Sequence, residues 1–178
     1  MPSKVHPVLK QFLSELKSPI PKPRYFRYRK YRATSKNVIT IPHHTFIDVA
    51  RSWKIKVFRE AHNGQYYAQY RHSLRQIALT SPHEHVFMHE LCHAAHFRIP
   101  GWRKTSDVER EVIAEFAALA LDRIIGSLNK NQIRKSNWYI AQHANYMHMT
   151  AYEAMCKVLP TVNEIVMLIL KSKEENIH

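Results

Sequence analysis

The segment His89-Glu90-Leu91-Cys92-His93 lies at the middle of a chain of 178 residues. Two histidines four residues apart lie on one face of a helix, so both imidazoles can reach a single ion at about 2.0 to 2.1 Å. Glu90 lies beside this face, where its carboxylate can hold and deprotonate a water bound to the ion. The spacing therefore predicts a zinc site (Zn2+) with His89 and His93 as ligands and Glu90 as the catalytic general base.

A catalytic zinc site needs a third protein ligand, and a downstream segment offers two carboxylates. Glu111 and Glu115 are one helical turn apart within an apolar pattern that predicts a helix from Val108 to Ile125. We expect Glu111 to be the ligand and Glu115 to accept a hydrogen bond from a bound histidine, because metal-bound imidazoles usually donate their other N–H to a carboxylate. The reverse assignment stays open.

Other side chains near this segment have alternative interpretations. His85 and His96 lie about one turn to either side of the histidine pair, so they are either extra ligands or polar lining of a cleft. Cys92 points elsewhere on the helix and fits a small buried apolar residue. Four residues could donate a hydrogen bond to an oxyanion or simply pack at the border of a core: Tyr70, His143, Tyr146 and His148.

Upstream of the histidine helix the spacing of apolar residues changes to that of strands. A helix is expected over Thr45 to Trp53, and strands over Asn37 to Ile41, Lys54 to Phe58, Gln65 to Tyr70 and Arg75 to Thr80. The pair Asn63-Gly64 is typical of a two-residue hairpin turn, because both positions need positive φ. We expect the last three strands to form a small antiparallel sheet.

Helical patterns dominate the second half of the chain. Ser81-Pro82-His83-Glu84 resembles a capping box, which predicts that the histidine helix begins at Pro82. Two further helices are expected over Gln132 to Met147 and Thr150 to Lys173. The predicted fold class is α+β, with a three-stranded antiparallel sheet packed on a helical bundle.

The amino-terminal segment is strongly basic. Apolar spacing predicts a short docking helix over Val5 to Leu16, and residues 18–36 are expected to form a basic arm. Residues 1–36 hold ten lysines and arginines against the single acid Glu15. Cations alternating with aromatic rings can follow a phosphate backbone and stack on bases, although tyrosines of a strand edge would give the same pattern. The candidate nucleic-acid contacts are Arg24, Arg27, Arg29, Lys30 and Arg32.

Composition limits the classes of function. The net charge of +13 favours phosphate backbones, anionic lipid surfaces or acidic proteins as partners without choosing among them. Two cysteines and no apolar leader predict a cytoplasmic protein without disulfides. The most apolar stretches, Val112 to Ile125 and Val158 to Leu170, are interrupted by charged residues or proline, so no membrane span is expected. The three glycines form no phosphate loop, so nucleotide cofactors are not expected.

Three stretches of this chain resemble the zincin-like metallopeptidase domain of ArdC-type antirestriction proteins and, more distantly, ImmA/IrrE-type peptidases. They are Ser73 to Thr80, His89 to His93, and Glu111 to Ala118, within a similarity that covers about Ile47 to Leu170. The family usually continues with Trp-Thr-Gly-His after the second histidine, whereas this chain has Ala94-Ala95-His96-Phe97. This departure leaves the predicted metal ligands in place.

The resemblance implies a zincin-like fold over residues 37–178, preceded by the helix and basic arm of residues 1–36. It also implies a zinc-dependent metallopeptidase with a gluzincin-type site that acts on DNA-associated or regulatory proteins. We expect a peptide substrate to lie antiparallel along an edge strand from Arg75 to Thr80. The alternative is an antirestriction-type DNA-binding protein that protects DNA through its basic arm, in which the metal site is structural or vestigial.

Overall fold

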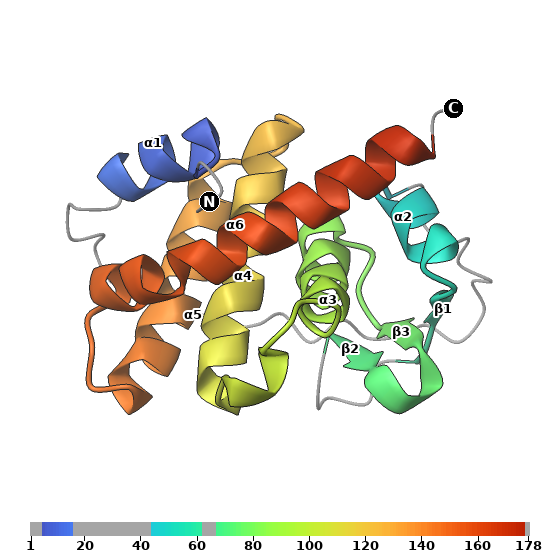
Figure 1. Cartoon of the computed structure of the whole chain (residues 1–178), viewed down its shortest axis with the longest axis horizontal. Helices are drawn as coiled ribbons and strands as arrows, with labels where there is room; N and C mark the ends of the chain where they lie inside the picture. Colours follow the sequence, from blue (N-terminus) through green and yellow to red (C-terminus); the bar gives the residue numbers. More distant parts are fainter. Residues whose placement is uncertain (1–4, 16–43, 62–66, 177–178) are drawn as a thin grey trace.

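The computed structural model describes residues 5–15, 44–61 and 67–176. Over these ranges the chain forms six α-helices, three β-strands and two short 3₁₀ helices (Figure 1). The helices are α1 (Pro7–Glu15), α2 (Ile47–Ser52), α3 (Glu84–His96), α4 (Asp107–Ile124), α5 (Lys130–Tyr146) and α6 (Ala151–Glu175). The strands are β1 (Lys56–Arg59), β2 (Ala68–Arg71) and β3 (Gln76–Leu79), and the 3₁₀ helices are η1 (His72–Leu74) and η2 (Trp102–Lys104). The predicted α+β class is confirmed.

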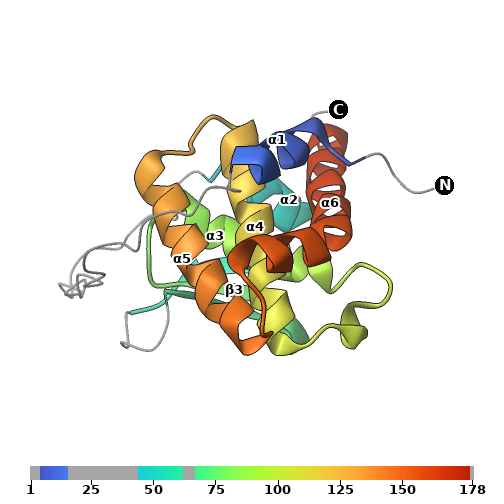
Figure 2. The same ribbon diagram turned by 90° about the vertical axis from the view of Figure 1, so that its left-hand side faces the viewer.

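The helix α4 lies at the centre of the helical part. Every residue from Val112 to Asp122 is buried, and a helix that is apolar on all sides has to be enclosed by other elements. Figures 1 and 2 show α4 between α3, α5 and α6, and α1 packs against it as well. The helix predicted from Val108 to Ile125 is confirmed to within one residue at each end.

The helix α1 packs its apolar face on the bundle. Leu9 and Phe12 are buried, and the Phe12 ring stacks on Phe116 of α4 with 6.2 Å between the ring centroids. Arg123, at the end of α4, donates to both carboxylate oxygens of Glu15 at 2.5 and 2.8 Å. The predicted docking helix is therefore confirmed.

The sheet is mixed, with the strand order β1-β3-β2. β1 runs parallel to β3, with Val57 opposite Ile77, whereas β2 runs antiparallel to β3, with Tyr70 opposite Ile77. The prediction of a purely antiparallel sheet, with a hairpin joining its first two strands, is wrong. β3 is the central strand, so the prediction of an edge strand from Arg75 to Thr80 is wrong too.

The physical reason for this pairing lies in the connection between β2 and β3. The 3₁₀ helix η1 and Arg75, whose φ is 49°, reverse the chain within four residues and make β2 and β3 the antiparallel pair. β1 comes earlier in the chain and takes the opposite side of β3. Tertiary packing and turn geometry decide which strands become neighbours in a sheet. The alternation of apolar residues within one strand does not reveal them.

The helix α3 lies between the sheet and α4, so it connects the two parts of the fold (Figure 1). It begins at Glu84, and its N-cap His83 makes no side-chain capping bond. The predicted capping box and the predicted start at Pro82 are therefore wrong. Glu84 instead accepts the Thr45 N–H at 2.8 Å and pairs with His44 Nδ1 at 2.7 Å. A tertiary contact thus takes the carboxylate that the cap would have used.

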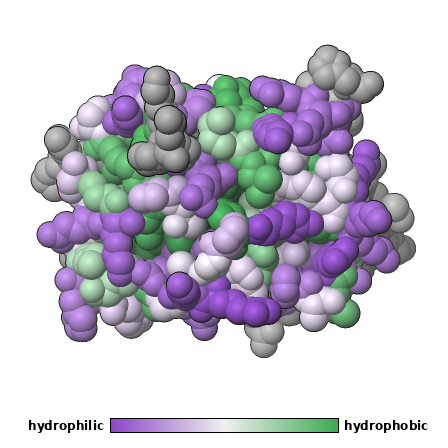
Figure 3. Space-filling view, viewed as in Figure 1, coloured by the Kyte–Doolittle hydropathy of each residue, from purple (hydrophilic) through white to green (hydrophobic). Residues whose placement is uncertain are grey.

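The two carboxy-terminal helices complete the bundle. α5 and α6 are confirmed close to their predicted bounds, and α6 begins with a capping box formed by Thr150 and Glu153. The face of the molecule that α6 crosses mixes hydrophilic side chains with smaller hydrophobic areas (Figure 3). Among the described helices, none has the length and apolar character that a membrane span requires.

Several predictions concern residues outside the described ranges. These are the basic arm of residues 18–36, the strand from Asn37 to Ile41 and the turn at Asn63-Gly64. The candidate nucleic-acid contacts Arg24, Arg27, Arg29, Lys30 and Arg32 belong to this group. They stay predictions.

Candidate metal centre

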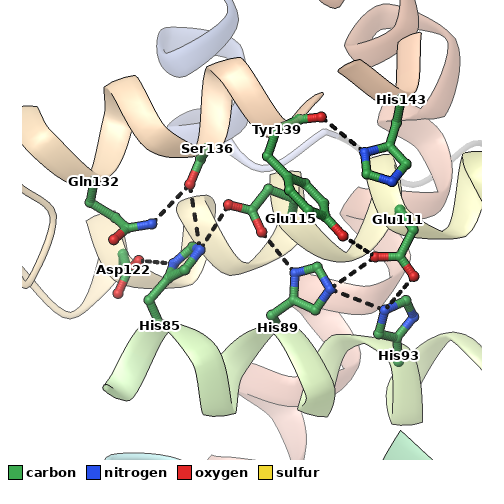
Figure 4. Close-up of polar contacts among 10 residues, drawn as sticks. All are labelled: His85, His89, His93, Glu111, Glu115, Asp122, Gln132, Ser136, Tyr139 and His143. Atoms are coloured by element: carbon green, nitrogen blue, oxygen red, sulfur yellow. Dashed lines mark hydrogen bonds and ion pairs between the residues drawn. The ribbon is translucent and has the colours of Figure 1, made fainter. Parts of the chain in front are cut away.

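Three side chains from two neighbouring helices converge on one point (Figure 4). His89 and His93 project from α3, and Glu111 projects from α4. The two Nε2 atoms lie 3.1 Å apart, and they lie 3.3 and 3.4 Å from the carboxylate oxygens of Glu111. We call these three residues the metal cluster.

The metal cluster fits one zinc ion in both geometry and ligand chemistry. Ligand atoms bound tetrahedrally at about 2.0 to 2.1 Å from zinc would lie about 3.3 Å from one another. The distance between the two Nε2 atoms and the distance from each Nε2 to its nearer Glu111 oxygen are close to this value. Imidazole nitrogen and carboxylate oxygen are ligands that zinc commonly takes. Within the described part of the chain, no other group of histidine, cysteine and acidic residues converges in this way.

Attraction between imidazole and carboxylate holds the metal cluster together. Burial alone would raise the pKa of Glu111, but hydrogen bonds from His89 and His93 hold it well below its ordinary value. Burial alone would lower the pKa of His89, but hydrogen bonds with Glu111 and Glu115 raise it well above its ordinary value. A bound cation would take the place of the protons that these groups share, because metal binding releases protons from its ligands.

Glu115 lies behind His89 and outside the metal cluster. Its Oε2 accepts a hydrogen bond from the Nδ1–H of His89 at 2.7 Å, and its Oε1 accepts one from His85 at 2.9 Å. Because the Nδ1 proton of His89 is engaged there, its Nε2 faces His93 and Glu111. The geometry therefore favours Glu111 as the third ligand and Glu115 as the residue that fixes the orientation of His89.

Glu90 is buried between α3 and the edge strand β2. Its carboxylate accepts the backbone N–H of Tyr70 at 2.6 Å. That N–H points away from β3, so the outer side of β2 faces the end of the Glu90 side chain. The structure thus places an edge strand, the predicted general base and the metal cluster on neighbouring elements.

The structure removes several of the candidate ligands and donors. His85 uses both ring nitrogens in bonds to Glu115 and Asp122, so it is not a third or fourth ligand. His96 is buried outside the metal cluster, where burial and the charges of His93 and Arg110 lower its pKa to about 4.

Three of the four candidate oxyanion donors point away from the metal cluster. The ring of Tyr70 packs against His72 and Phe97, and Tyr146 and His148 are exposed on the outer surface. Only His143 reaches the neighbourhood of the metal cluster, where its ring packs on Tyr139 with 4.3 Å between centroids.

Sequence reasoning missed Tyr139, which lies on α5. Its hydroxyl donates to Glu111 Oε2 at 2.6 Å (Figure 4). Burial and the charge of Glu111 raise the pKa of Tyr139 above its ordinary value, so the hydroxyl keeps its proton at neutral pH. The one signal available in the sequence was its spacing of four residues from His143, which places both rings on one face of the helix.

Cys92 is fully buried among apolar side chains. Burial and the nearby charges of Asp122, Glu115 and Glu90 raise the pKa of its thiol well above the ordinary value. The thiol therefore stays protonated, as expected of a packing residue.

Comparisons with protein-family models, with curated proteins and with solved structures found no match to this chain. The resemblance to ArdC-type proteins therefore stays a prediction that rests on the three sequence stretches.

Proposed function

We propose that this chain is a zinc-dependent metallopeptidase. His89, His93 and Glu111 would hold the ion, and Glu90 would act as the general base. The observation that carries the proposal is the convergence of three zinc-type ligand atoms, with Glu115 fixing one of the imidazoles from behind. The predicted catalytic carboxylate lies on the same helix, one residue after the first histidine.

The chain's own residues have distinct tasks in peptide hydrolysis. A bound zinc ion supplies a Lewis acid and lowers the pKa of a water molecule that it binds. Glu90 takes the proton from the attacking water and passes it to the leaving amine, as general bases in hydrolysis do. Tyr139 keeps its hydroxyl proton at neutral pH and donates it to Glu111 Oε2, which would hold that carboxylate in place as a metal ligand.

The outer side of β2 is the proposed place for the substrate backbone. Thr80 donates its N–H to the Tyr67 carbonyl at 2.8 Å, so in an antiparallel ladder the backbone groups of Ala68 and Tyr70 point away from β3. The bond from Tyr70 N–H to Glu90 agrees with this alternation. A peptide that adds to this edge as a further strand would run past the carboxylate of Glu90. β2 thus takes the role of substrate-binding edge strand that was expected for Arg75 to Thr80.

The substitution Glu90→Gln tests the function. Glutamine keeps the size of the side chain but cannot take a proton, so we expect hydrolysis to fall by about 100-fold to 10,000-fold. Zinc content should stay that of the wild type, because Glu90 is not in the metal cluster. Both are measured on the same samples, with a library of quenched fluorescent peptides for hydrolysis and mass spectrometry for zinc.

Glu164→Gln is the matched control, since Glu164 is exposed on α6 and the chemical change is the same. It should retain full hydrolysis and full zinc content. Equal hydrolysis by the wild type and Glu90→Gln would overturn the proposed role of Glu90. A wild-type protein that binds no zinc would overturn the metal centre itself.

A further inference from the structure

His85 connects two buried carboxylates of α4 on the side of the metal cluster nearer the start of α3 (Figure 4). Its Nδ1 lies 2.5 Å from Asp122 Oδ2, and its Nε2 lies 2.9 Å from Glu115 Oε1. The side chains of His85, Glu115 and Asp122 are only 13, 9 and 4 % exposed. We call these three residues the buried network.

The buried network extends to the metal cluster at one end and to a loop at the other. The second oxygen of Glu115 accepts the Nδ1–H of His89 at 2.7 Å. The second oxygen of Asp122 accepts the hydroxyl proton of Ser127 at 2.7 Å. Each carboxylate therefore uses both of its oxygens, and a continuous chain of hydrogen bonds leads from Ser127 to His89.

The hydrogen bonds of the buried network require a cationic His85. An ionised carboxylate can accept hydrogen bonds but cannot donate them, so His85 has to donate from both ring nitrogens. Burial alone would lower the pKa of His85, but Glu115 and Asp122 outweigh this effect and raise it to about 9. Two carboxylates buried without such a partner would be costly. The two ring nitrogens point at different carboxylates, so the network does not form a second metal site.

The helix α5 closes over the same point. Ser136 is fully buried, and its Oγ lies 3.4 Å from His85 Nε2. The same Oγ accepts a hydrogen bond from Gln132 at 2.9 Å. His85 is thus held by groups from α4 and α5 as well as by its own helix.

We propose that His85 and Asp122 are positioning residues for the metal centre. By binding one oxygen of Glu115, His85 orients the other oxygen toward His89 and so keeps His89 Nε2 directed at the metal. Asp122 fixes His85 in turn. Groups that orient metal ligands in this way commonly change metal affinity when they are replaced. The inference rests on the proposed zinc site, and it adds two residues that lie outside the ligand set.

The substitution His85→Gln tests this inference in the full-length protein. Glutamine is uncharged and carries both of its N–H donors on one nitrogen, so it cannot replace two ring nitrogens that face different carboxylates. We expect the affinity for Zn2+ to fall by about 10-fold to 100-fold, measured in competition with a chromophoric chelator. The visible bands of the Co2+-substituted protein should also shift, because they report on the ligand geometry. Asp122→Ala removes the carboxylate that holds His85 Nδ1, and it should weaken Zn2+ binding by about 10-fold.

His96→Gln is the matched control. His96 is buried on the same helix but does not belong to the buried network, so Zn2+ affinity and the Co2+ bands should stay as in the wild type. If wild type binds Zn2+ and folded His85→Gln binds it equally tightly, the positioning role is overturned while the metal centre stands. If His85→Gln fails to fold, unchanged affinity in Asp122→Ala overturns it. A wild type that binds no Zn2+ overturns both.

Discussion

The metal cluster and the buried network draw on the same two helices and the same side-chain types. In the metal cluster, the Nε2 atoms of His89 and His93 both face Glu111, whose side chain is 33 % exposed. In the buried network, the two nitrogens of His85 face two different carboxylates, which are 9 and 4 % exposed. Histidines and carboxylates one turn apart on α3 and α4 therefore form a converging cluster in one place and a linear chain of ion pairs in the other.

The difference between the two arrangements lies in where the ring nitrogens point. Each nitrogen of His85 has its own carboxylate acceptor, so the buried network is complete without a metal ion. The Nε2 atoms of His89 and His93 lie only 3.1 Å apart and share one carboxylate. A cation between them would satisfy all three groups at once. Convergence on one partly exposed point, rather than the residue types alone, distinguishes a metal site from a structural ion pair.

Replacing one carboxylate of the metal cluster and one of the buried network should give the largest difference in Zn2+ affinity between two variants. Structural zinc sites with four protein ligands bind zinc with about 10 to 16 kcal/mol, which corresponds to about 2.5 to 4 kcal/mol for each ligand. Glu111→Gln should therefore weaken Zn2+ binding by about 500-fold. Glu115→Gln only loosens the orientation of His89, so a loss of about 10-fold to 100-fold is expected. Titration of the metal-free proteins against a chelator measures both.

The same two variants also test which of the two glutamates binds the metal. A larger loss of affinity in Glu115→Gln than in Glu111→Gln would reverse the assignment of ligand and orienting residue. Thermal unfolding in the presence of chelator provides the control, because it separates loss of zinc from loss of the fold.

Local patterns were enough to predict most of the helices. The apolar run of α4 and the amphipathic face of α1 are properties of consecutive residues, so they can be read without knowledge of the partner elements. Strand pairing could not be read in this way, because the position of β1 beside β3 depends on contacts between distant segments. The missing cap at Glu84 has the same cause, since its partner His44 lies 40 residues away.

In the candidate site, too, contacts within one helix could be predicted and contacts between helices could not. The pairs His89 with His93 and Glu111 with Glu115 follow from helical spacing within one element. The bonds of His85 to Asp122 and of Tyr139 to Glu111 join residues 37 and 28 positions apart. They depend on how α3, α4 and α5 are rotated against one another. A single sequence does not encode that rotation in any local pattern.

The pH dependence of stability should show that the buried network contains a cation. The folded-state pKa of His85, about 9, lies above its ordinary value of 6.5. Its contribution to stability is therefore fully present below pH 6.5 and is lost as the pH rises through 9. In chelator, the unfolding free energies of wild type and His85→Gln should differ by about 2 to 3 kcal/mol more at pH 6 than at pH 10. Urea unfolding at each pH measures this difference.

A difference between these two proteins that stays constant with pH would contradict the cationic state of His85. Glu115 sets the acidic limit of the measurement. Its pKa is held below the ordinary value of 4.5, so its own contribution to stability is lost as the pH falls below that value. The comparison is best made above this range.

The smallest effect on stability is expected from a residue that caps α4 but belongs neither to the metal cluster nor to the buried network. Ser106 caps this helix: its Oγ accepts the Glu109 N–H at 3.3 Å, and Glu109 accepts the Ser106 N–H at 3.0 Å. Ser106→Ala should lower the unfolding free energy by about 1 kcal/mol and leave Zn2+ affinity unchanged. Thr150→Ala, in the equivalent cap of α6, is the matched control with the same expected loss. If Ser106→Ala alone weakens Zn2+ binding, the start of α4 positions Glu111, and the metal cluster depends on more than the pairing of α3 with α4.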